Sequence, residues 1–587
     1  MHMDMTARDG MGVRDAGRSP WREGARVPWL AAALAIAPIV AICVLLPPFY
    51  AMNPDDQVQA LFASGRFLNA DAGLMMPYTL APVSVPLGLL YRVAPAVPWY
   101  PFLLLAGTAV SFAIAFDHLW RGRMHDGLCA VMTVLLLGLE VVTLGYFTYT
   151  IVAFLVISAG FMLLLRRCAF ARAGRPHASD LAACLLIVAG YALRPESGMA
   201  AVAVFSPFAL WVLVRNRHAG AILRGVAALA CIGLAVAAGQ AAYRATPGWE
   251  TYPDYLDAGR SVLDYPELSV EEVRSVAPEL SANDVEVMYD WDFIDEEVFG
   301  TELFERVGEA STRFYPQNLV DSLGAKTTYL LIAFALFAGL IAWLVGRDMG
   351  RRDVLVLAMG VAFMLLVSYG LLVLRARPRL HVVIPLLAVA LFALTTCGFA
   401  PKAESRGSHA AAPRHAGAIS GRLAVAAPIA TALVTAAACL GFFLMTVLPV
   451  RDQASAPTVA AAHAYVEDHP DQLIVCGHTQ SLLYAGFDAM AFEGWEFPGN
   501  VLPIGGWESH TAPWYEFLDR NGLSPRDALM ELGRRDDMVA ILQPRAMGLM
   551  EAYLTEHLGR PVACEVVEDL GPGVVDPSAH LLVCRFS

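Results

Sequence analysis

Two adjacent acids, Asp55 and Asp56, lie in the run Asn-Pro-Asp-Asp-Gln at 53–57, shortly after the first long apolar segment of the chain. Two carboxylates held at one depth beside a membrane can bind a metal ion or share a proton. Charged residues near a membrane face cost little when they are merely solvated, so the pair is a candidate site only. Its chemistry depends on which other groups reach the same membrane face.

Arginines are the second group of residues with a chemical use. Arg194 lies in the tripeptide Arg-Pro-Glu with Glu196, and three more arginines cluster between two later apolar segments, at Arg375, Arg377 and Arg379. An arginine at the headgroup level either extends to lipid phosphates or binds an anionic group through paired hydrogen bonds. The sequence leaves both readings open.

The elements that must position these residues are membrane helices. Of the 587 residues, 57% are hydrophobic and 16% are charged, which is more apolar than a soluble protein of this length requires. A bilayer core of roughly 30 Å needs about 20 apolar residues per helix. Eleven segments approach that length, and the fold class is therefore a polytopic α-helical membrane protein. The predicted spans are 28–46, 99–119, 127–145, 147–165, 180–194, 197–214, 224–243, 326–346, 354–374, 380–399 and 423–447.

Five short basic loops predict the orientation of these spans. They lie at 121–123, 166–175, 215–224, 347–352 and 402–422. All five fall on one side of the membrane, which the positive-inside rule makes the cytoplasmic side. The N-terminus is then inside, the C-terminus is outside, and the loop at 47–98 faces out. The proline-containing segment 79–95 is short for a span and is expected to lie along the surface or to re-enter the membrane.

Glu140 then falls in the outer half of the span at 127–145. An acid at that depth either supports the site, as Glu196 also would, or is satisfied by a structural partner. Both interpretations stay open from the sequence.

The negative charge of the chain belongs to one outer loop. The net charge is −13, and residues 244–322 contain 19 acidic and 5 basic side chains. Nucleic acid is excluded as a partner because its backbone requires concentrated Lys and Arg. The run 290–297 could coordinate a divalent cation through its carboxylates, although acidic runs commonly form solvated faces. Arg260 of the same loop could contact a polar substrate.

The segment 449–587 has no further long apolar run and alternates strand-like and helical patterns, which predicts a small α/β domain outside the membrane. The expected strands are 473–476, 538–542, 562–567 and 579–586, and the expected helices are 457–468, 513–534 and 544–558. Its glycines lack the spacing of a nucleotide-binding loop, so no nucleotide is expected.

Two further features of this domain have open interpretations. The aromatic stretch 492–515 would stack on a sugar, lie against lipid headgroups, or pack the domain onto the membrane part. Cys564 and Cys584 lie in two candidate strands, where they either form a disulfide or remain isolated buried thiols.

The predicted organisation is a cytoplasmic tail at 1–27, a membrane domain at 28–448 and an extracytoplasmic α/β domain at 449–587. Together with the Asp55-Asp56 pair at the start of the first outer loop, this arrangement resembles the GT-C superfamily of integral-membrane glycosyltransferases. The resemblance implies a sugar donor carried on polyprenyl phosphate, a catalytic acid in the first outer loop, and inverting transfer. It places the reaction at the outer face of the plasma membrane and leaves open whether a divalent cation takes part.

The resulting functional hypothesis is sugar transfer from a polyprenyl-phosphate donor to an envelope glycan or protein, in a bacterial cell to judge from the scarcity of lysine. One acid of the pair would deprotonate the acceptor hydroxyl, and the outer arginines would hold the donor phosphate. These arginines are Arg194, Arg375, Arg377 and Arg379.

A transporter or flippase of an envelope lipid or solute is the alternative from another class, and a non-catalytic envelope scaffold is the third. Ionisable residues gather at the outer ends of the spans rather than at mid-span, which favours surface chemistry over transport. Eleven spans are also more than a scaffold needs as an anchor.

Overall fold

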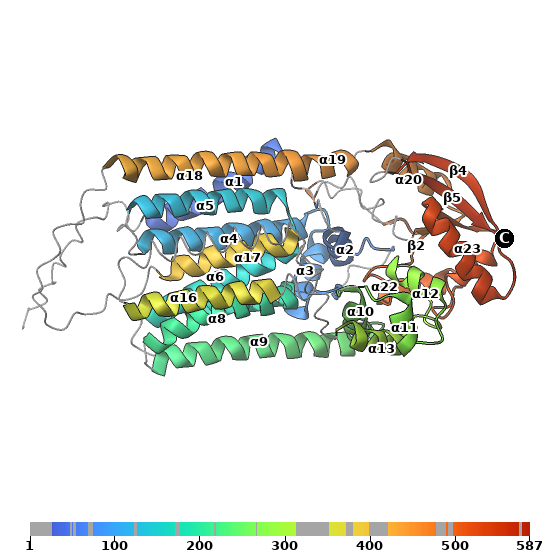
Figure 1. Cartoon of the computed structure of the whole chain (residues 1–587), viewed down its shortest axis with the longest axis horizontal. Coiled ribbons are helices and arrows are strands. Elements are labelled where there is room, and N and C mark those ends of the chain that lie inside the picture. Colours follow the sequence, from blue (N-terminus) through green and yellow to red (C-terminus); the bar gives the residue numbers. More distant parts are fainter. Residues whose placement is uncertain are drawn as a thin grey trace, which may run out of the picture.

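The part of the chain that the computed structural model describes is a long helix bundle joined to a polar head (Figure 1). The head consists of residues 252–311 together with residues 457–587. The described residues are 26–46, 48, 50, 54–68, 74–122, 126–170, 177–215, 219–265, 267–312, 351–370, 380–397, 421–454, 456–476, 489–490, 497–573 and 578–587.

Apolar helices form the bundle, and ten of the eleven segments predicted as spans are helices. They are α1 (Val27–Leu45), α4 (Trp99–Arg121), α5 (Asp126–Gly145), α6 (Tyr149–Phe170), α7 (Ala178–Leu193), α8 (Pro195–Arg215), α9 (Ala219–Ala245), α16 (Arg351–Tyr369), α17 (Leu380–Cys397) and α18 (Gly421–Phe442). The π-helix η3 (Phe443–Val447) and α19 (Leu448–Ala454) continue α18. The predicted span at 326–346 and most of the tail at 1–27 lie outside the described residues.

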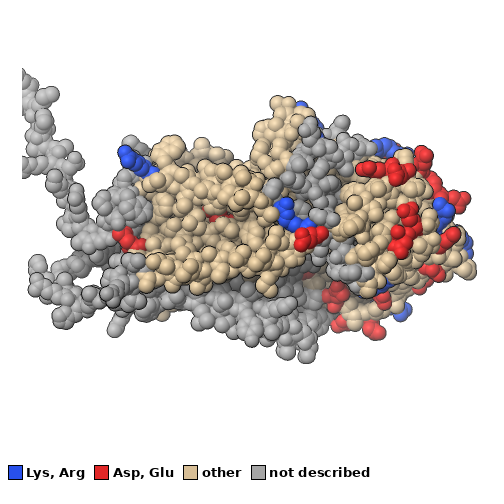
Figure 2. Space-filling view, turned by 90° about the horizontal axis from the view of Figure 1, so that it is seen from above, with Lys and Arg blue, Asp and Glu red and all other residues tan. Residues whose placement is uncertain are grey.

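Six helical segments of the described chain are long and apolar enough to cross a membrane. They are α1, α4, α5, α6, α9 and the segment that begins at Pro428 in α18. These are the helices of a membrane-embedded protein, although a total of eleven spans stays a prediction. On the face drawn in Figure 2, the described surface of the bundle is almost uncharged between its two ends, and most of the acidic and basic side chains in view lie on the head.

Three of the predicted basic loops meet at the end of the bundle farthest from the head. Asp117 near the end of α4 accepts hydrogen bonds from Arg121 and from Arg166 of α6, each over 2.7 Å. Asp180 of α7 likewise pairs with Arg167 and Arg224. The shared acids place these loops at one end, as the positive-inside pattern requires, while the side of the membrane on which they lie stays a prediction.

Close packing of α6 against α7 sets the geometry at the opposite end. A Cβ atom on Gly190 of α7 would lie 2.5 Å from the backbone nitrogen of Ile157 in α6, so only glycine permits this approach. The first residue of α6, Tyr149, therefore comes close to Arg194, which directly follows α7.

Two short helices, α2 (Pro54–Ser64) and α3 (Ala81–Val93), lie between the bundle and the head (Figure 1). α3 accounts for the segment 79–95; its 13 residues are fewer than a bilayer crossing needs, and it packs on α7 and α9. The chain before α3 is tied to the end of α7, because the Leu80 amide donates to the Ala192 carbonyl over 2.8 Å.

The head contains a five-stranded sheet with the strand order β2-β1-β3-β5-β4. The strands are β1 (Leu473–Cys476), β2 (Val501–Pro503), β3 (Met538–Leu542), β4 (Cys564–Pro572) and β5 (His580–Phe586). β1 runs parallel to β2 and β3, whereas β5 runs antiparallel to β3 and β4. Every residue of β1 and β3 is buried, as expected for central strands covered on both faces.

Within the described residues, the acidic segment predicted as an outer loop contributes four helices to the head. They are α10 (Tyr252–Leu263), α11 (Val270–Val276), α12 (Ala282–Tyr289) and α13 (Thr301–Ser311). Asp295, which follows α12, is buried and accepts hydrogen bonds from the Leu529 amide and the Tyr553 hydroxyl.

The helices α20 (Pro457–Asp468) and α23 (Pro544–Leu558) have the predicted bounds, but α22 (Ala512–Arg520) is much shorter than the helix expected at 513–534. The helix stops because Asn521 and Gly522 follow, and Gly522 has a φ of +66°, a conformation that glycine adopts at little cost. A 3₁₀ turn, η4 (Met530–Gly533), follows instead. The strand β2 was not predicted, and β4 extends beyond the predicted 562–567.

The described part of the aromatic stretch and the two cysteines of the C-terminal segment both lie where the head packs on other elements or on itself. Phe497 packs on Phe67 with ring centroids 5.2 Å apart, and Trp507 packs on Tyr78, so these aromatic side chains join the head to the membrane-side elements. Cys564 and Cys584 are free thiols on the paired strands β4 and β5.

Candidate functional site

The acidic pair opens α2. Pro54 occupies the first helical position, and Asp55 and Asp56 follow in the first turn, where the helix dipole favours negative charge. From Asp56 to Ala63 every residue of α2 is buried. A short helix enclosed in this way holds both carboxylates in fixed directions.

Asp56 is enclosed by hydrogen-bond donors. Its Oδ1 accepts from the Tyr100 hydroxyl over 2.9 Å and from the Tyr149 backbone amide over 2.8 Å, and the Thr148 side chain also hydrogen-bonds to it. Burial raises the pKa of this carboxyl to about 7, although the three hydrogen bonds oppose the rise, while the charge of Asp55 adds to it. Asp56 therefore titrates near neutral pH, well above the usual range of a carboxyl, and it ties α2 to α4 and α6.

Asp55 meets an arginine. Its Oδ2 lies 3.7 Å from Nη1 of Arg194 and 3.4 Å from the Tyr149 hydroxyl. The side chains of Asp55 and Arg194 are 18% and 13% exposed, so the pair is largely shielded from water. Arg194 also donates to Tyr149 Oη and to Thr150 Oγ1, the latter over 3.0 Å. These contacts place the carboxylate and the guanidinium side by side.

The backbone explains why Arg194 points into the site. It ends α7 in an extended conformation, with φ −154° and ψ 105°, and Pro195 begins α8. A residue before proline is disfavoured in the helical region, so the sequence Arg-Pro both stops α7 and fixes the direction of Arg194.

A second arginine reaches the site from the head. Arg260 of α10 donates to Oε1 of Glu196, whose Oε2 lies 3.8 Å from Nε of Arg194. Glu196 thus joins the two guanidinium groups. Nη2 of Arg260 is buried and has no hydrogen-bond partner among the residues that the structure describes. The site therefore holds an unused cationic donor.

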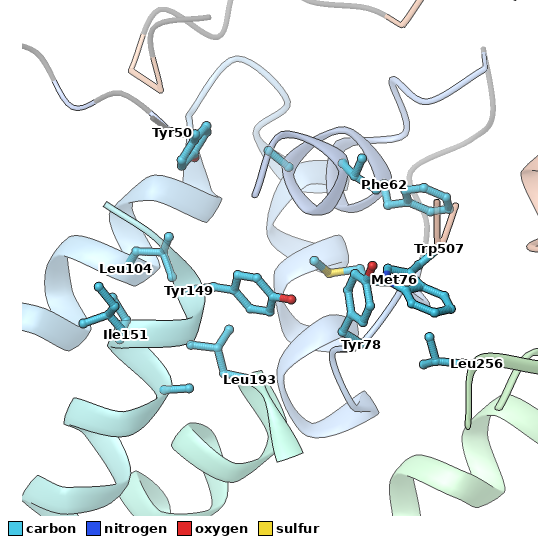
Figure 3. Packing of buried hydrophobic residues seen from close by; sticks show 14 of the residues in the cluster. Tyr50, Phe62, Met76, Tyr78, Leu104, Tyr149, Ile151, Leu193, Leu256 and Trp507 are labelled. Carbon is cyan, nitrogen blue, oxygen red and sulfur yellow. The ribbon is translucent and has the colours of Figure 1, made fainter. Parts of the chain in front are cut away.

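Tyr78 lies at the centre of this group and connects the bundle to the head. Arg260 and Arg194 lie 5.1 and 5.7 Å from its ring centroid. Trp507 packs on the Tyr78 ring in an edge-on contact, with the ring centroids 6.5 Å apart (Figure 3). The Tyr149 hydroxyl points toward Tyr78 in the same view. Tyr78 has a φ of +62°, which costs a non-glycine residue about 1 to 3 kcal/mol and is typical of functional sites.

The structure brings together four of the residues selected from the sequence: Asp55, Asp56, Arg194 and Glu196. Glu140 stands apart from them: it is fully buried in α5, and neither of its carboxylate oxygens has a hydrogen-bond partner within the described part of the chain. The predicted phosphate-binding residues Arg375, Arg377 and Arg379 lie outside the described residues.

Sequence reasoning gave no site role to Tyr78 or Tyr149. It gave only loose ones to Arg260, as a contact for a polar substrate, and to Trp507, as part of the aromatic stretch 492–515. One signal was available, since the run Tyr-Phe-Thr-Tyr-Thr at 146–150 interrupts two apolar segments with polar groups. Nothing in the sequence marks Tyr78, whose role comes from its backbone conformation and its neighbours.

A group able to hold a metal ion lies elsewhere in the head. Asp284 of α12 and Glu556 and His557 of α23 have candidate ligand atoms within 4.8 Å of one another. His557 Nε2 already lies 2.8 Å from Asp284 Oδ1, so these two residues are paired. The run 290–297 does not form such a group, because Asp295 is turned into the interior of the head.

Comparisons with protein-family models, with curated proteins and with solved structures found no match to the chain. The chemistry of the site is therefore inferred from its residues and their geometry.

Proposed function

We propose that the chain is a membrane glycosyltransferase that moves a sugar from a polyprenyl-phosphate donor to an envelope acceptor, with the head on the extracytoplasmic side of the plasma membrane. The proposal extends the GT-C resemblance of the sequence to a specific group of side chains. The observation that carries it is the contact between Asp55 and Arg194, 3.7 Å apart at the end of an apolar bundle. A transfer from a lipid phosphate needs both a base and a cation at such a boundary.

The two acids take different roles in this proposal. Asp55 is the base, because its side chain is the more exposed of the two and adjoins Arg194. Asp56 orients α2, because Tyr100, Tyr149 and Thr148 already occupy its carboxylate. As the acceptor hydroxyl attacks the anomeric carbon, its proton passes to Asp55 and the bond to the donor phosphate breaks.

Arg194 and Arg260 hold the leaving phosphate. A guanidinium presents several N–H donors in one plane, which suits phosphate oxygens, and Nη2 of Arg260 has a donor to spare. Glu196 keeps the two cations together in the absence of substrate. Roles for Arg375, Arg377 and Arg379 at the same phosphate stay predictions from the sequence.

The decisive test replaces Asp55 by asparagine, which preserves shape and removes the base. Membrane vesicles containing the variant would receive a panel of synthetic polyprenyl-phosphate sugars, and donor consumption would be measured. We expect Asp55→Asn to reduce turnover at least 100-fold, as loss of a general base typically does. Asp254→Asn is the matched control, since Asp254 is 55% exposed on α10 and pairs only at the surface with Arg244. Full turnover in Asp55→Asn would disprove the assignment.

A second test concerns the phosphate. Arg260→Met removes the spare guanidinium, and we expect the KM for the donor to rise about tenfold or more, because charge-assisted hydrogen bonds to phosphate are lost. An unchanged KM would remove Arg260 from the phosphate site while leaving the role of Asp55 intact.

Transport is retained as the second candidate because of Glu140. This buried acid lies within a candidate membrane span and has no hydrogen-bond partner among the residues that the structure describes, as is typical of proton or substrate pathways. If the panel of donors is bound but not consumed, and Glu140→Gln stops movement of the lipid across the vesicle membrane, transport replaces glycosyl transfer. A non-catalytic scaffold does not require the acids and arginines to meet, so the contact between Asp55 and Arg194 supports the enzyme over the scaffold.

A further inference from the structure

The turn that follows α2 is built in a conformation that needs external support. Leu68 is fully buried and has a φ of +54°, in the left-handed region that residues with a side chain rarely adopt. Such a conformation persists only where surrounding contacts hold it. The turn also ends the helix whose first turn carries Asp55 and Asp56.

The head supplies that support from two points. The Phe497 amide donates to the Arg66 carbonyl over 2.9 Å, and the Phe497 ring packs on Phe67. Nη2 of Arg520 donates to the Leu68 carbonyl over 2.6 Å. A guanidinium hydrogen bond to a carbonyl is stronger than a neutral one, so Arg520 makes the stronger of the two polar contacts.

The same stretch of the head also reaches Tyr78. Arg520 is the last residue of α22, and the loop before α22 carries Trp507, which packs on Tyr78. The Trp507 carbonyl is fixed in turn by the Tyr252 hydroxyl over 2.9 Å. One segment, residues 507–520, therefore contacts both the turn after α2 and the aromatic centre of the site.

We propose that Arg520 is a positioning residue: by holding the Leu68 carbonyl it fixes the rotation and the axial position of α2, and so places Asp55. Leu68 lies in the turn directly after Ser64, the last residue of α2, and the 11 residues of α2 form a helix only about 16 Å long, so movement of this turn is passed along the helix to its first turn. The effect on turnover rests on the proposed glycosyl transfer, whereas the effect on α2 itself does not.

The experiment is hydrogen–deuterium exchange on the full-length protein in lipid nanodiscs, followed by mass spectrometry of peptides that cover α2. Arg520→Met keeps the length of the side chain and removes its donors, and we expect α2 amides to exchange about tenfold faster. Arg520→Lys restores a cationic donor and should return exchange most of the way to wild type. Arg526→Met is the matched control, because Arg526 is 71% exposed in the same head and contacts only Glu297 among the ion pairs found.

Two outcomes would overturn the proposal. One is wild-type exchange in α2 of Arg520→Met. The other is an equal rise in β3 and β5, which would show that the head as a whole had loosened. Should Arg520→Met not fold, Arg520→Lys still decides the question. If Arg520 positions α2, the α2 amides of Arg520→Lys exchange slightly faster than those of wild type while β3 and β5 do not change. If Arg520 only stabilises the head, the exchange in α2 does not change separately from that in β3 and β5.

Steady-state kinetics separate a positioning role of Arg520 from a purely structural one, because kcat and the KM for the donor respond differently. If α2 carries the base, Arg520→Met should lower kcat about tenfold with an unchanged KM for the donor, and Arg520→Lys should recover most of kcat. Failure of the proposed function would appear separately, as an active Asp55→Asn variant. The exchange result would stand in that case.

Discussion

Replacing Asp56 by asparagine tests whether this carboxyl is truly a buried, proton-holding anchor. Burial raises its pKa from 3.8 to about 7, so between these pH values the folded protein holds a proton that the unfolded chain has released. Stability must then fall as the pH rises through this window, by about 1.4 kcal/mol per pH unit, and level off above pH 7. The full loss is about 4 kcal/mol, of which about 3 kcal/mol falls between pH 5 and pH 8.

Asparagine cannot titrate, yet it keeps an oxygen that can accept from the Tyr149 amide and the Tyr100 hydroxyl. Unfolding in detergent, followed by tryptophan fluorescence at several pH values, would give the free energy for each protein. We expect wild type to lose about 3 kcal/mol more than Asp56→Asn between pH 5 and pH 8.

Asp295 supplies the comparison within the same molecule, because burial also raises its pKa to about 7 and it remains in both proteins. Some pH dependence should therefore survive in Asp56→Asn. The reasoning would be refuted if wild type and Asp56→Asn had parallel stability profiles, or if the variant lost more stability at high pH than wild type.

Two further predictions concern the packing of the bundle and a paired acid and histidine in the head. Gly190→Ala should destabilise the bundle by about 1 to 3 kcal/mol and reduce turnover, because the new methyl group meets the backbone of Ile157 and separates α6 from α7; Gly233→Ala in α9, with open space around it, should leave the thermal midpoint unchanged. In the head, the hydrogen bond to Asp284 raises the pKa of His557, so wild type should lose stability as the pH rises above 6.5 and through the folded pKa. His557→Gln keeps a donor that does not titrate. Thermal unfolding between pH 6 and pH 8 should therefore show a smaller decrease in the midpoint temperature for His557→Gln than for wild type.

The membrane helices could be predicted from the sequence because their physical requirement is simple. A bilayer sets a minimum length of apolar residues, and ten of the predicted segments are helices within a few residues of their expected ends. α20 and α23 were placed well for a related reason, since proline at the first helical position marks each start. Local chemistry of this kind is visible in a single sequence.

The errors have local causes as well. β2 has three residues, too few for an alternating pattern to appear, and α22 ends at a glycine turn inside an otherwise helical composition. The acidic stretch 244–322 was predicted as an outer loop because its charge is high. Its apolar residues nevertheless recur at helical spacing and build the faces of α10 and α13 that are buried in the head.

The candidate site was predictable only in part because its members are far apart in the chain. Asp55 and Arg194 were selected singly, from their types and their position beside apolar segments, but no local pattern states that they touch. Tyr149 reaches Asp55 because α6 and α7 pack closely, and Trp507 reaches Tyr78 because the head folds back onto α2. Contacts of this kind follow from tertiary packing, which one sequence does not contain.

The hydrogen bond from Arg520 to the turn after α2 also has a consequence for biosynthesis. Asp55 leaves the ribosome 465 residues before Arg520, which at typical translation rates is a delay of roughly 20 to 90 seconds. Until that part of the chain has been made, α2 has its contacts with α4 and α6 but lacks those that the head makes with the turn after it. Truncation before Arg520 should therefore leave a product whose helix bundle is formed but whose acidic helix is held from one side alone.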